Sequence, residues 1–240
     1  MAYNDRLLHS RRYSATRVRF MAIAFLMVHV GAGVFGRGSS ESPTTDPVTA
    51  LNAAPQNTET AVLAGGCFWG VEAVFERLEG VQDVVSGYSG GSADTASYYT
   101  IGSGTTGHAE SVQIVYDPTV IRFEVLLQIF FNVAHDPTQL NYQGPDVGPQ
   151  YRSIVFYADR EQQQIAEGYI KELDRRGVFA EPIVTQVAPL KAFYPAEEYH
   201  QDFMRRNPQH PYIVYWDLPK ILHLEETYPE LLAKPIAGGH

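Results

Sequence analysis

Cys67 is the only cysteine among the 240 residues and lies in the hexapeptide GGCFWG, over residues 65–70. The apolar run over residues 60–64 predicts a strand before it, and apolar residues at helical spacing follow it (Val71, Val74, Phe75 and Leu78). We therefore expect Cys67 at a helix N-terminus, where unpaired backbone N–H groups and the helix dipole favour a thiolate. The glycines permit a sharp turn, and Phe68 and Trp69 could wall a small apolar pocket. The pattern predicts a nucleophile facing a small apolar substrate.

Two other interpretations of Cys67 fit the sequence less well. A lone cysteine is often a small buried apolar residue, but packing alone requires neither a tight turn nor flanking aromatic side chains. Residues 63–67 loosely resemble a lipoprotein cleavage site, but no long apolar run precedes them. Because the 240 residues contain one cysteine, they cannot form a disulfide among themselves or a zinc site with several thiolate ligands. Redox chemistry at Cys67 would therefore need a second molecule.

Glu110 is the first acidic candidate to act with this cysteine. It enters a predicted strand whose apolar positions are Ala109, Val112 and Ile114, which indicates partial burial. A buried carboxyl has a raised pKa and can remain a proton donor. The alternative is an ordinary strand glutamate that faces water.

Hydroxyl and carboxyl groups in two other segments are further candidates. The long polar loop over residues 135–152 contains Asp146 and Tyr151, and it could carry function or be a solvated connector. Tyr98 and Tyr99 could donate hydrogen bonds to a polar substrate atom.

Other kinds of site are not indicated by the sequence. Among the scattered histidines and aspartates only His200 and Asp202 show ligand spacing on one predicted element, and two side chains do not make a metal site. The glycines at 87, 90 and 91 follow a strand but do not precede a predicted helix, so they do not form a phosphate-binding or dinucleotide-binding loop.

The charge of the chain is unevenly distributed. Residues 1–37 carry six arginines and one acidic residue, a net charge of +5. The whole chain has a net charge of −9, so the remaining residues carry −14. We expect no metal, no cofactor and no nucleic-acid partner.

The N-terminal segment has the composition of a targeting signal. Basic residues precede a mostly apolar stretch over residues 20–36, an order typical of export signals, so residues 1–37 are predicted to be an export signal or an N-terminal anchor. A protein exported in this way would be periplasmic or extracellular. A misassigned start, which would leave the protein cytoplasmic, is the remaining alternative. Residues 38–58 are rich in Ser, Thr, Pro, Asn and Ala and are predicted to be a linker.

From residue 59 to 207 short β-rich runs alternate with helical patterns, which predicts one domain of the α+β class. Besides the strand before Cys67, we expect four strands, over residues 81–88, 109–116, 153–158 and 182–187. Helices are expected over residues 123–133, from an Asp159 cap to Arg176, and over residues 196–205. Pro208, Pro211 and Pro219 predict an irregular C-terminal tail over residues 208–240.

Six motifs in collinear order resemble one known family. They are GGCFWG, GYSGG, TGHAESVQIVYDP, HDPTQ, GPQYRS and YPAEEYHQDF, and the resemblance covers residues 60–208. Together they are similar to peptide methionine sulfoxide reductase of the A type. The resemblance implies a mixed α/β two-layer sandwich, ferredoxin-like, that reduces methionine S-sulfoxide, free or in proteins, without a cofactor, and so repairs oxidised proteins.

The resemblance also implies roles for seven residues. Cys67 would be the nucleophile and Glu110 the acid that protonates the sulfoxide oxygen. Tyr98 and Tyr151 would help to hold that oxygen. Phe68 and Trp69 would form the pocket for the substrate methyl group, and Asp146 would lie in the supporting hydrogen-bond shell.

This sequence departs from the family pattern in its tail. Many relatives keep further cysteines there to resolve the sulfenic acid, whereas residues 208–240 contain none. An external thiol, such as thioredoxin, a glutaredoxin or glutathione, is therefore the expected reductant of a monomeric enzyme. The alternatives are a one-cysteine thiol peroxidase, which leaves Phe68, Trp69 and Glu110 without an obvious role, and an exported, non-enzymatic binding domain.

Overall fold

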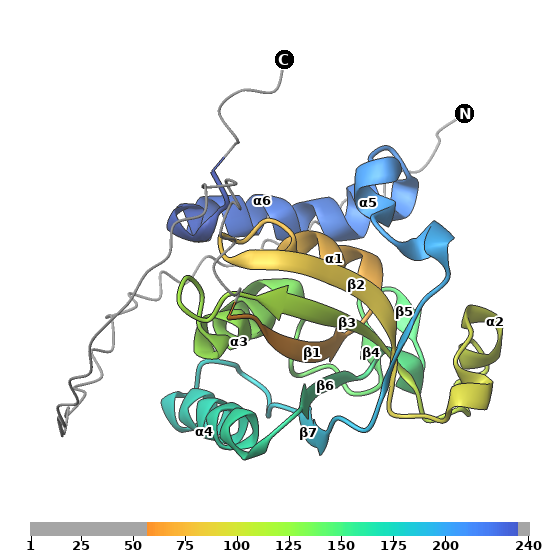
Figure 1. The fold of residues 1–240 in the computed structure, drawn as a ribbon, viewed down its shortest axis with the longest axis horizontal. Helices are drawn as coiled ribbons and strands as arrows, with labels where there is room; N and C mark the ends of the chain where they lie inside the picture. Colours follow the sequence, from red (N-terminus) through yellow and green to blue (C-terminus); the bar gives the residue numbers. More distant parts are fainter. Residues whose placement is uncertain (1–56, 235–240) are drawn as a thin grey trace, which may run out of the picture. The chain divides into compact units, whose positions relative to one another are not determined.

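A six-stranded sheet forms the centre of the chain (Figure 1). The computed structural model describes residues 57–234. The strand order is β7-β6-β1-β3-β2-β8, and every neighbouring pair is antiparallel except β6 with β7. The strands are β1 (Glu59–Gly65), β2 (Val81–Ser89), β3 (Ala109–Tyr116), β6 (Ser153–Tyr157), β7 (Gln186–Pro189) and β8 (Phe193–Pro195). A separate two-stranded ribbon pairs β4 (Tyr142–Gln143) with β5 (Asp146–Val147).

Both faces of the central strands are buried, which explains why β1 is a continuous apolar run. Ala61 and Leu63 belong to the larger core, whereas Val62 and Ala64 face a smaller cluster on the opposite side. We expected Ala109 to share a buried face with Val112 and Ile114. Ala109 lies in the smaller cluster instead, on the opposite face of the sheet from these two residues. Glu110 alternates with Ala109 along β3 and lies on the face of the larger core.

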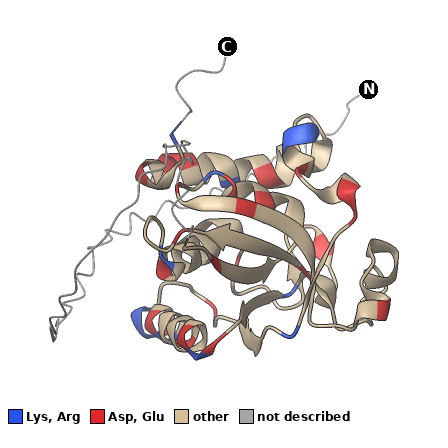
Figure 2. Cartoon of the chain, in the orientation of Figure 1, with Lys and Arg blue, Asp and Glu red and all other residues tan. Residues whose placement is uncertain are grey.

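The helices join the larger core, which confirms the predicted α+β class. Helix α1 packs on β2 and β3, while α5 and α6 pack on α1; α4 packs on β6, β7 and α3. The helices are α1 (Phe68–Phe75), α2 (Tyr98–Ile101), α3 (Phe123–Ile129), α4 (Arg160–Arg176), α5 (Phe203–Arg206) and α6 (Leu218–Thr227). Figure 2 shows charged residues mainly on the helices and loops around the sheet, with both signs on α4.

Helix α4 begins and ends where the sequence predicts. The Asp159 side chain accepts a hydrogen bond from the Gln162 N–H at 2.8 Å, which satisfies a free donor at the helix start. Gly177 ends the helix in the left-handed conformation at φ 60°.

Three predicted elements differ in the structure. The strand expected over residues 182–187 is β7, which begins only at Gln186, where it pairs with β6. The helix expected over residues 123–133 is α3 followed by a π-type turn, Phe130–Ala134. The helix expected over residues 196–205 is a 3-10 turn, Glu198–His200, and then α5.

The side chain of Gln201 explains the break in this last helix. Its Oε1 accepts a hydrogen bond from the Ser86 N–H and its Nε2 donates to the Ser86 carbonyl, both at 2.9 Å. Gln201 thus pairs with the backbone of β2 in an extended conformation, and Asp202 follows in the left-handed region at φ 53°. A tertiary contact overrides the local helical pattern here.

The prediction of an irregular C-terminal tail is wrong, because residues 211–227 form a continuous helical run. It contains a π-type turn, Ile213–Asp217, and then α6, and a 3-10 turn follows at Pro229–Leu231. Pro211 begins the run and Pro219 lies in the first turn of α6, where a missing N–H is tolerated. Buried apolar residues then face the core at helical spacing: Ile213, Ile221, Leu224 and Tyr228.

The predicted export signal or anchor at 1–37, and the linker up to residue 56, lie outside the described residues. Within residues 57–234 no helix combines the length and the apolar character needed to cross a bilayer.

Candidate active site

Cys67 lies at the junction between β1 and α1, as its sequence context predicts. Gly66 turns the chain at φ 92°, and a Cβ atom there would lie 2.5 Å from the Cβ of Gln143, so both the conformation and the space require glycine. Cys67 is the N-cap residue of α1 and is only 9% exposed. The thiol is therefore at a helix N-terminus but almost out of contact with water.

Glu110 is a buried carboxyl beside this helix start. It is 3% exposed, and its Oε2 accepts a hydrogen bond from the Phe68 N–H at 3.1 Å. Burial raises its pKa to about 8, and the nearby charge of Asp146 adds to this, while the Phe68 hydrogen bond opposes it. The predicted buried carboxyl with a raised pKa is confirmed, so Glu110 carries a proton at neutral pH.

The expected resting thiolate at Cys67 is not supported by the electrostatics of the site. Burial raises the pKa of the thiol well above its usual value, and the carboxylates of Glu110 and Asp217 raise it further at the pH where they are ionised. A hydrogen bond from the backbone of Trp69 lowers the pKa, as a helix N-terminus should, but it does not outweigh burial. The helix geometry is as predicted, whereas the resting group is a thiol.

Tyr98 and Tyr151 come from two different segments, and both phenols are within range of the charges of Glu110 and Cys67. Tyr98 begins α2 and is 40% exposed, and Tyr151 ends a 3-10 turn, Pro149–Tyr151. Burial raises the pKa of both phenols, and the charges of Glu110 and Cys67 raise it further. Both hydroxyls therefore remain hydrogen-bond donors.

Phe68 and Trp69 pack beside Cys67 in an aromatic cluster. The Phe68 ring lies 5.0 Å from the ring of His200, and Trp69 stacks on Phe203 with ring centroids 3.7 Å apart. The indole Nε1–H of Trp69 donates to His200 Nδ1 at 3.2 Å, which fixes the orientation of the indole. His200 and Phe203 are supporting residues that the sequence pattern did not identify.

Asp146 lies on β5 and is tied to the C-terminal segment. Its Oδ2 accepts a hydrogen bond from the hydroxyl of Tyr212. Burial raises the pKa of Asp146, whereas the Tyr212 hydrogen bond and the charge of Lys220 lower it. Asp146 thus joins a hydrogen-bonded shell around Cys67, with a partner from the tail that the sequence analysis set aside.

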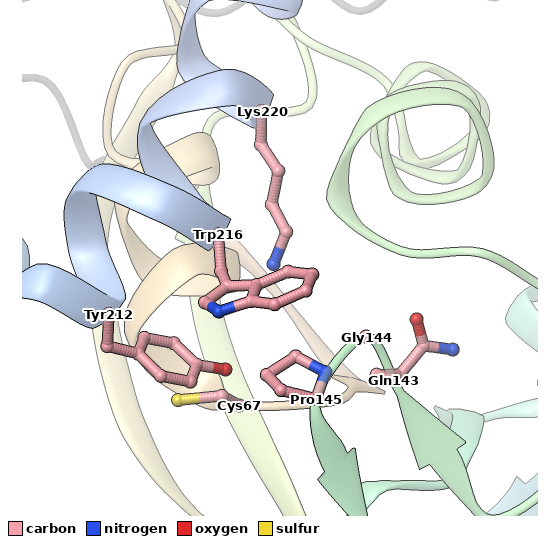
Figure 3. A pocket seen from close by; sticks show the side chains of 7 residues that line it. All are labelled: Cys67, Gln143, Gly144, Pro145, Tyr212, Trp216 and Lys220. Atoms are coloured by element: carbon pink, nitrogen blue, oxygen red, sulfur yellow. The ribbon is translucent and has the colours of Figure 1, made fainter. Parts of the chain in front are cut away.

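A small cavity of about 50 Å³ opens at Cys67. Tyr212, Trp216 and Lys220 approach it from the C-terminal helical segment, opposite the ribbon that contains Gln143 and Pro145 (Figure 3). Of the seven predicted site residues only Cys67 lines this cavity. The other six do not line it: Glu110, Tyr98, Tyr151, Phe68, Trp69 and Asp146. The helical spacing of apolar residues after Pro211 was the signal that could have placed the C-terminal residues here.

The other buried histidines make structural contacts. His108 Nδ1 accepts from the Gly91 N–H at 3.2 Å and its Nε2 lies 3.0 Å from the Ser92 carbonyl. Burial lowers the pKa of His135 to about 4, and its Nδ1 lies 2.8 Å from the Phe130 carbonyl. Among the described residues no three His, Cys, Asp or Glu side chains are grouped as a metal ion would require.

Comparison with known proteins gives one family. Residues 59–230 match the family described as peptide methionine sulfoxide reductase. Peptide methionine sulfoxide reductase MsrA 2 of Mesorhizobium japonicum is 55% identical over 185 residues, which cover 77% of this chain and 94% of that protein. MsrA 2 of Synechocystis sp. is 49% identical over 210 residues, with 86% and 97% covered.

Two solved structures agree with this result. The reduced form of Mxr1 from Saccharomyces cerevisiae has a TM-score of 0.59 at 35% identity, covering 65% of this chain and 90% of that one. Methionine sulfoxide reductase A of Corynebacterium diphtheriae has a TM-score of 0.57 at 36% identity, with 67% and 79% covered. The family match favours a reductase over the peroxidase and the binding domain, and the chain belongs to the peptide methionine sulfoxide reductase family of the A type, enzymes that reduce methionine S-sulfoxide and repair oxidised proteins.

Proposed function

We propose that Cys67 attacks the sulfur of methionine S-sulfoxide while Glu110 protonates the sulfoxide oxygen. A sulfoxide sulfur is a poor electrophile until its oxygen is protonated or strongly hydrogen-bonded. The observation that carries the proposal is the pairing, at the start of α1, of the Cys67 thiol with a carboxyl that burial keeps neutral up to about pH 8.

The protons and electrons of this step balance within the pair. The Cys67 sulfur forms a bond to the sulfoxide sulfur, the oxygen takes the Glu110 proton, and Glu110 then takes up the thiol proton. The adduct releases methionine and leaves the oxygen on Cys67 as a sulfenic acid. Sulfoxide sulfur is reduced and Cys67 is oxidised by the same two electrons.

The surrounding residues would hold the substrate for this step. Tyr98 and Tyr151 would donate hydrogen bonds to the oxygen, because both phenols are within range of the charges of Glu110 and Cys67 and stay protonated. Phe68 and Trp69 would receive the methyl group in the aromatic cluster that His200 and Phe203 brace. Asp146 would support this arrangement through Tyr212.

Substitution of the two reacting groups tests these roles. With dithiothreitol as reductant and dabsylated methionine S-sulfoxide as substrate, Cys67→Ser should abolish turnover by the full chain. Glu110→Gln should lower kcat/KM by about 10²- to 10⁴-fold, since general acid catalysis contributes this much. The matched control is Glu79→Gln, an exposed carboxyl for which no change is expected. Wild-type activity in the Glu110→Gln variant would contradict the proposed acid.

An external thiol is proposed as the reductant of the sulfenic acid, because no second cysteine is present in the 240 residues. Its thiolate would attack the Cys67 sulfur, the S–O bond would break, and the hydroxide would leave as water after protonation. A second thiol would then break the mixed disulfide and release Cys67. Oxidised full-length protein should form a mixed disulfide with glutathione, a glutaredoxin or a thioredoxin variant that lacks its resolving cysteine. Failure of all three to reduce Cys67 would contradict this part of the proposal.

We also propose that the protein is exported and acts as a monomer on oxidised proteins outside the cytoplasm. The basic and then apolar order of residues 1–37 supports export. Fractionation of cells expressing the full chain should place it outside the cytoplasm, and an Arg11→Gln/Arg12→Gln variant should accumulate inside. Light scattering should give the mass of one chain. Cytoplasmic retention of the wild-type protein would contradict export, and a stable dimer would contradict the monomeric state.

A further inference from the structure

The C-terminal helical segment brings a lysine to the cavity that Cys67 lines. Lys220 and Cys67 both line the cavity of about 50 Å³, and among the described residues that line it Lys220 alone has a cationic side chain. Figure 3 shows this side chain extending from the helix beside Trp216 toward the cavity. The position is therefore built by the segment after Pro211, not by the motifs around Cys67.

Asp217 fixes the lysine in place. The Asp217 side chain is fully buried, and its Oδ1 lies 3.1 Å from Lys220 Nζ. Within residues 57–234 no group donates a hydrogen bond to its Oδ2, and Lys220 is the cation that pairs with this carboxylate. Gly70 leaves room for the pair, because a Cβ atom there would overlap Asp217 Oδ1 and lie 2.9 Å from Lys220 Nζ. The ion pair is thus packed against the first turn of α1, directly after Cys67.

The carboxyl groups near Cys67 oppose negative charge on its sulfur. They are Glu110 from β3, Asp146 from β5 and Asp217 before α6, and their charges raise the pKa of the thiol. A cysteine that must carry negative charge during reaction needs a positive partner in such surroundings.

We propose that Lys220, anchored by Asp217, is the positive charge that stabilises the anionic form of Cys67 during the reaction. This inference rests on the proposed role of Cys67 as nucleophile. Cys67 carries negative charge twice: when it attacks the sulfoxide sulfur, and when the disulfide with an external thiol is broken and Cys67 takes the electron pair of the S–S bond. A thiol with a lower pKa is a better leaving group, and a nearby positive charge lowers the pKa. One lysine would therefore assist both steps.

The pH dependence of Cys67 alkylation tests this directly. The rate of reaction of the full-length protein with iodoacetamide reports the thiolate fraction of its only cysteine. Lys220→Met should move the midpoint to higher pH by about one unit or more, since a nearby opposite charge shifts a pKa by about 1–3 units. Asp217→Asn should move it to lower pH, and the double variant should return it close to wild type. Lys171→Met, an exposed lysine on α4, is the matched control.

The opposite directions of the two expected pH shifts, in Lys220→Met and in Asp217→Asn, distinguish an electrostatic role of the pair from a structural one. A pair that only held the fold together would give shifts in the same direction, or none, in Lys220→Met and Asp217→Asn, and that result would overturn the proposal. If Lys220→Met fails to fold because Asp217 is left unpaired, comparison of Asp217→Asn with the double variant still isolates Lys220. Alkylation does not depend on turnover, so turnover that persists in Cys67→Ser would refute the proposed function without deciding the role of Lys220.

Discussion

Glu110 and Cys67 both hold a proton at neutral pH because both are buried at the start of α1. The helix N-terminus lowers the pKa of the thiol less than burial and the neighbouring carboxyls raise it. A protonated acid and a protonated nucleophile side by side suit a reaction that needs one proton on the substrate oxygen and returns one from the thiol. Negative charge on sulfur then develops only when the substrate is bound.

The first prediction concerns the pH dependence of this pair. The folded-state pKa of Glu110 is raised to about 8, so the proton donor is present below that pH and is lost above it. Methionine formation in a single turnover should therefore fall as pH rises through about 8. Glu110→Gln should be slow throughout and lack this decline. A wild-type rate that stays constant or rises between pH 7 and 9 would contradict a neutral Glu110 as the acid.

Adjacent tyrosines provide a second prediction. Tyr98 faces the site and is 40% exposed, whereas Tyr99 is 95% exposed. Tyr98→Phe should lower kcat/KM for methionine S-sulfoxide by about tenfold, because it removes one hydrogen bond of about 1–3 kcal/mol to a developing charge. Tyr99→Phe should leave the value unchanged. Equal effects of the two substitutions would show that the Tyr98 hydroxyl does not contact the substrate oxygen.

At the scale of elements, the first turn of α1 depends on its contact with the C-terminal helical segment. Gly70 lies on α1 where Asp217 and Lys220 pack against it, so a larger side chain would displace the ion pair. The same turn contains Phe68, whose N–H binds Glu110. Packing of α6 and the order of the active site are therefore linked.

Two glycine substitutions test this link. Gly70→Ala should destabilise the fold by about 1–3 kcal/mol, the typical cost of overpacking. Gly168→Ala on α4 is the matched control, since its Cβ atom would meet nothing within 4 Å, and it should stabilise by about 0.5–1 kcal/mol. Urea unfolding midpoints measure both. Stabilisation by Gly70→Ala would contradict the close packing of Asp217 against α1.

The elements that could be predicted from sequence are those defined by local signals. The buried strand β1 and the capped helix α4 each show their pattern within a short window. The break at Gln201 could not be predicted, because its cause is a pair of hydrogen bonds to Ser86 on a distant strand. The C-terminal helix was missed because prolines were interpreted as breakers, although the first turn of a helix accepts them.

The same distinction holds for the active site. Cys67 and Glu110 were found because a glycine-rich turn and a strand pattern mark them locally. The protonated thiol, the cavity and Lys220 depend on how a distant segment packs over Cys67, and no local pattern records that. Sequence could therefore mark the groups that we propose to react, but not the charges that surround them.

At the scale of the whole molecule, buried carboxyls make stability depend on pH in an unusual direction. Burial raises the pKa of Glu72 and of Glu110 to about 8 from an ordinary value of 4.5. The unfolded chain releases these protons at lower pH than the folded one, so the free energy of unfolding should fall as pH rises from about 4.5 to about 8.

Glu72→Gln should remove part of this pH dependence. Glu72 is 2% exposed on α1, and it is not among the residues proposed to react. The Tm of the variant relative to wild type should increase on going from pH 5.5 to pH 8.5, on the order of a few °C. Glu79→Gln, an exposed carboxyl, should show no such trend. A difference between Glu72→Gln and wild type that is constant with pH would mean that Glu72 is ionised in the folded protein.

The most direct measurement is a single turnover of the full-length protein with excess methionine S-sulfoxide and no reductant. We expect one methionine per chain and a sulfenic acid that dimedone traps at Cys67, because these residues offer no second thiol to restore it. Cys67→Ser should give neither product. Methionine formed by Cys67→Ser, or none formed by folded wild-type protein with a titratable thiol, would contradict the assignment of Cys67 as the nucleophile.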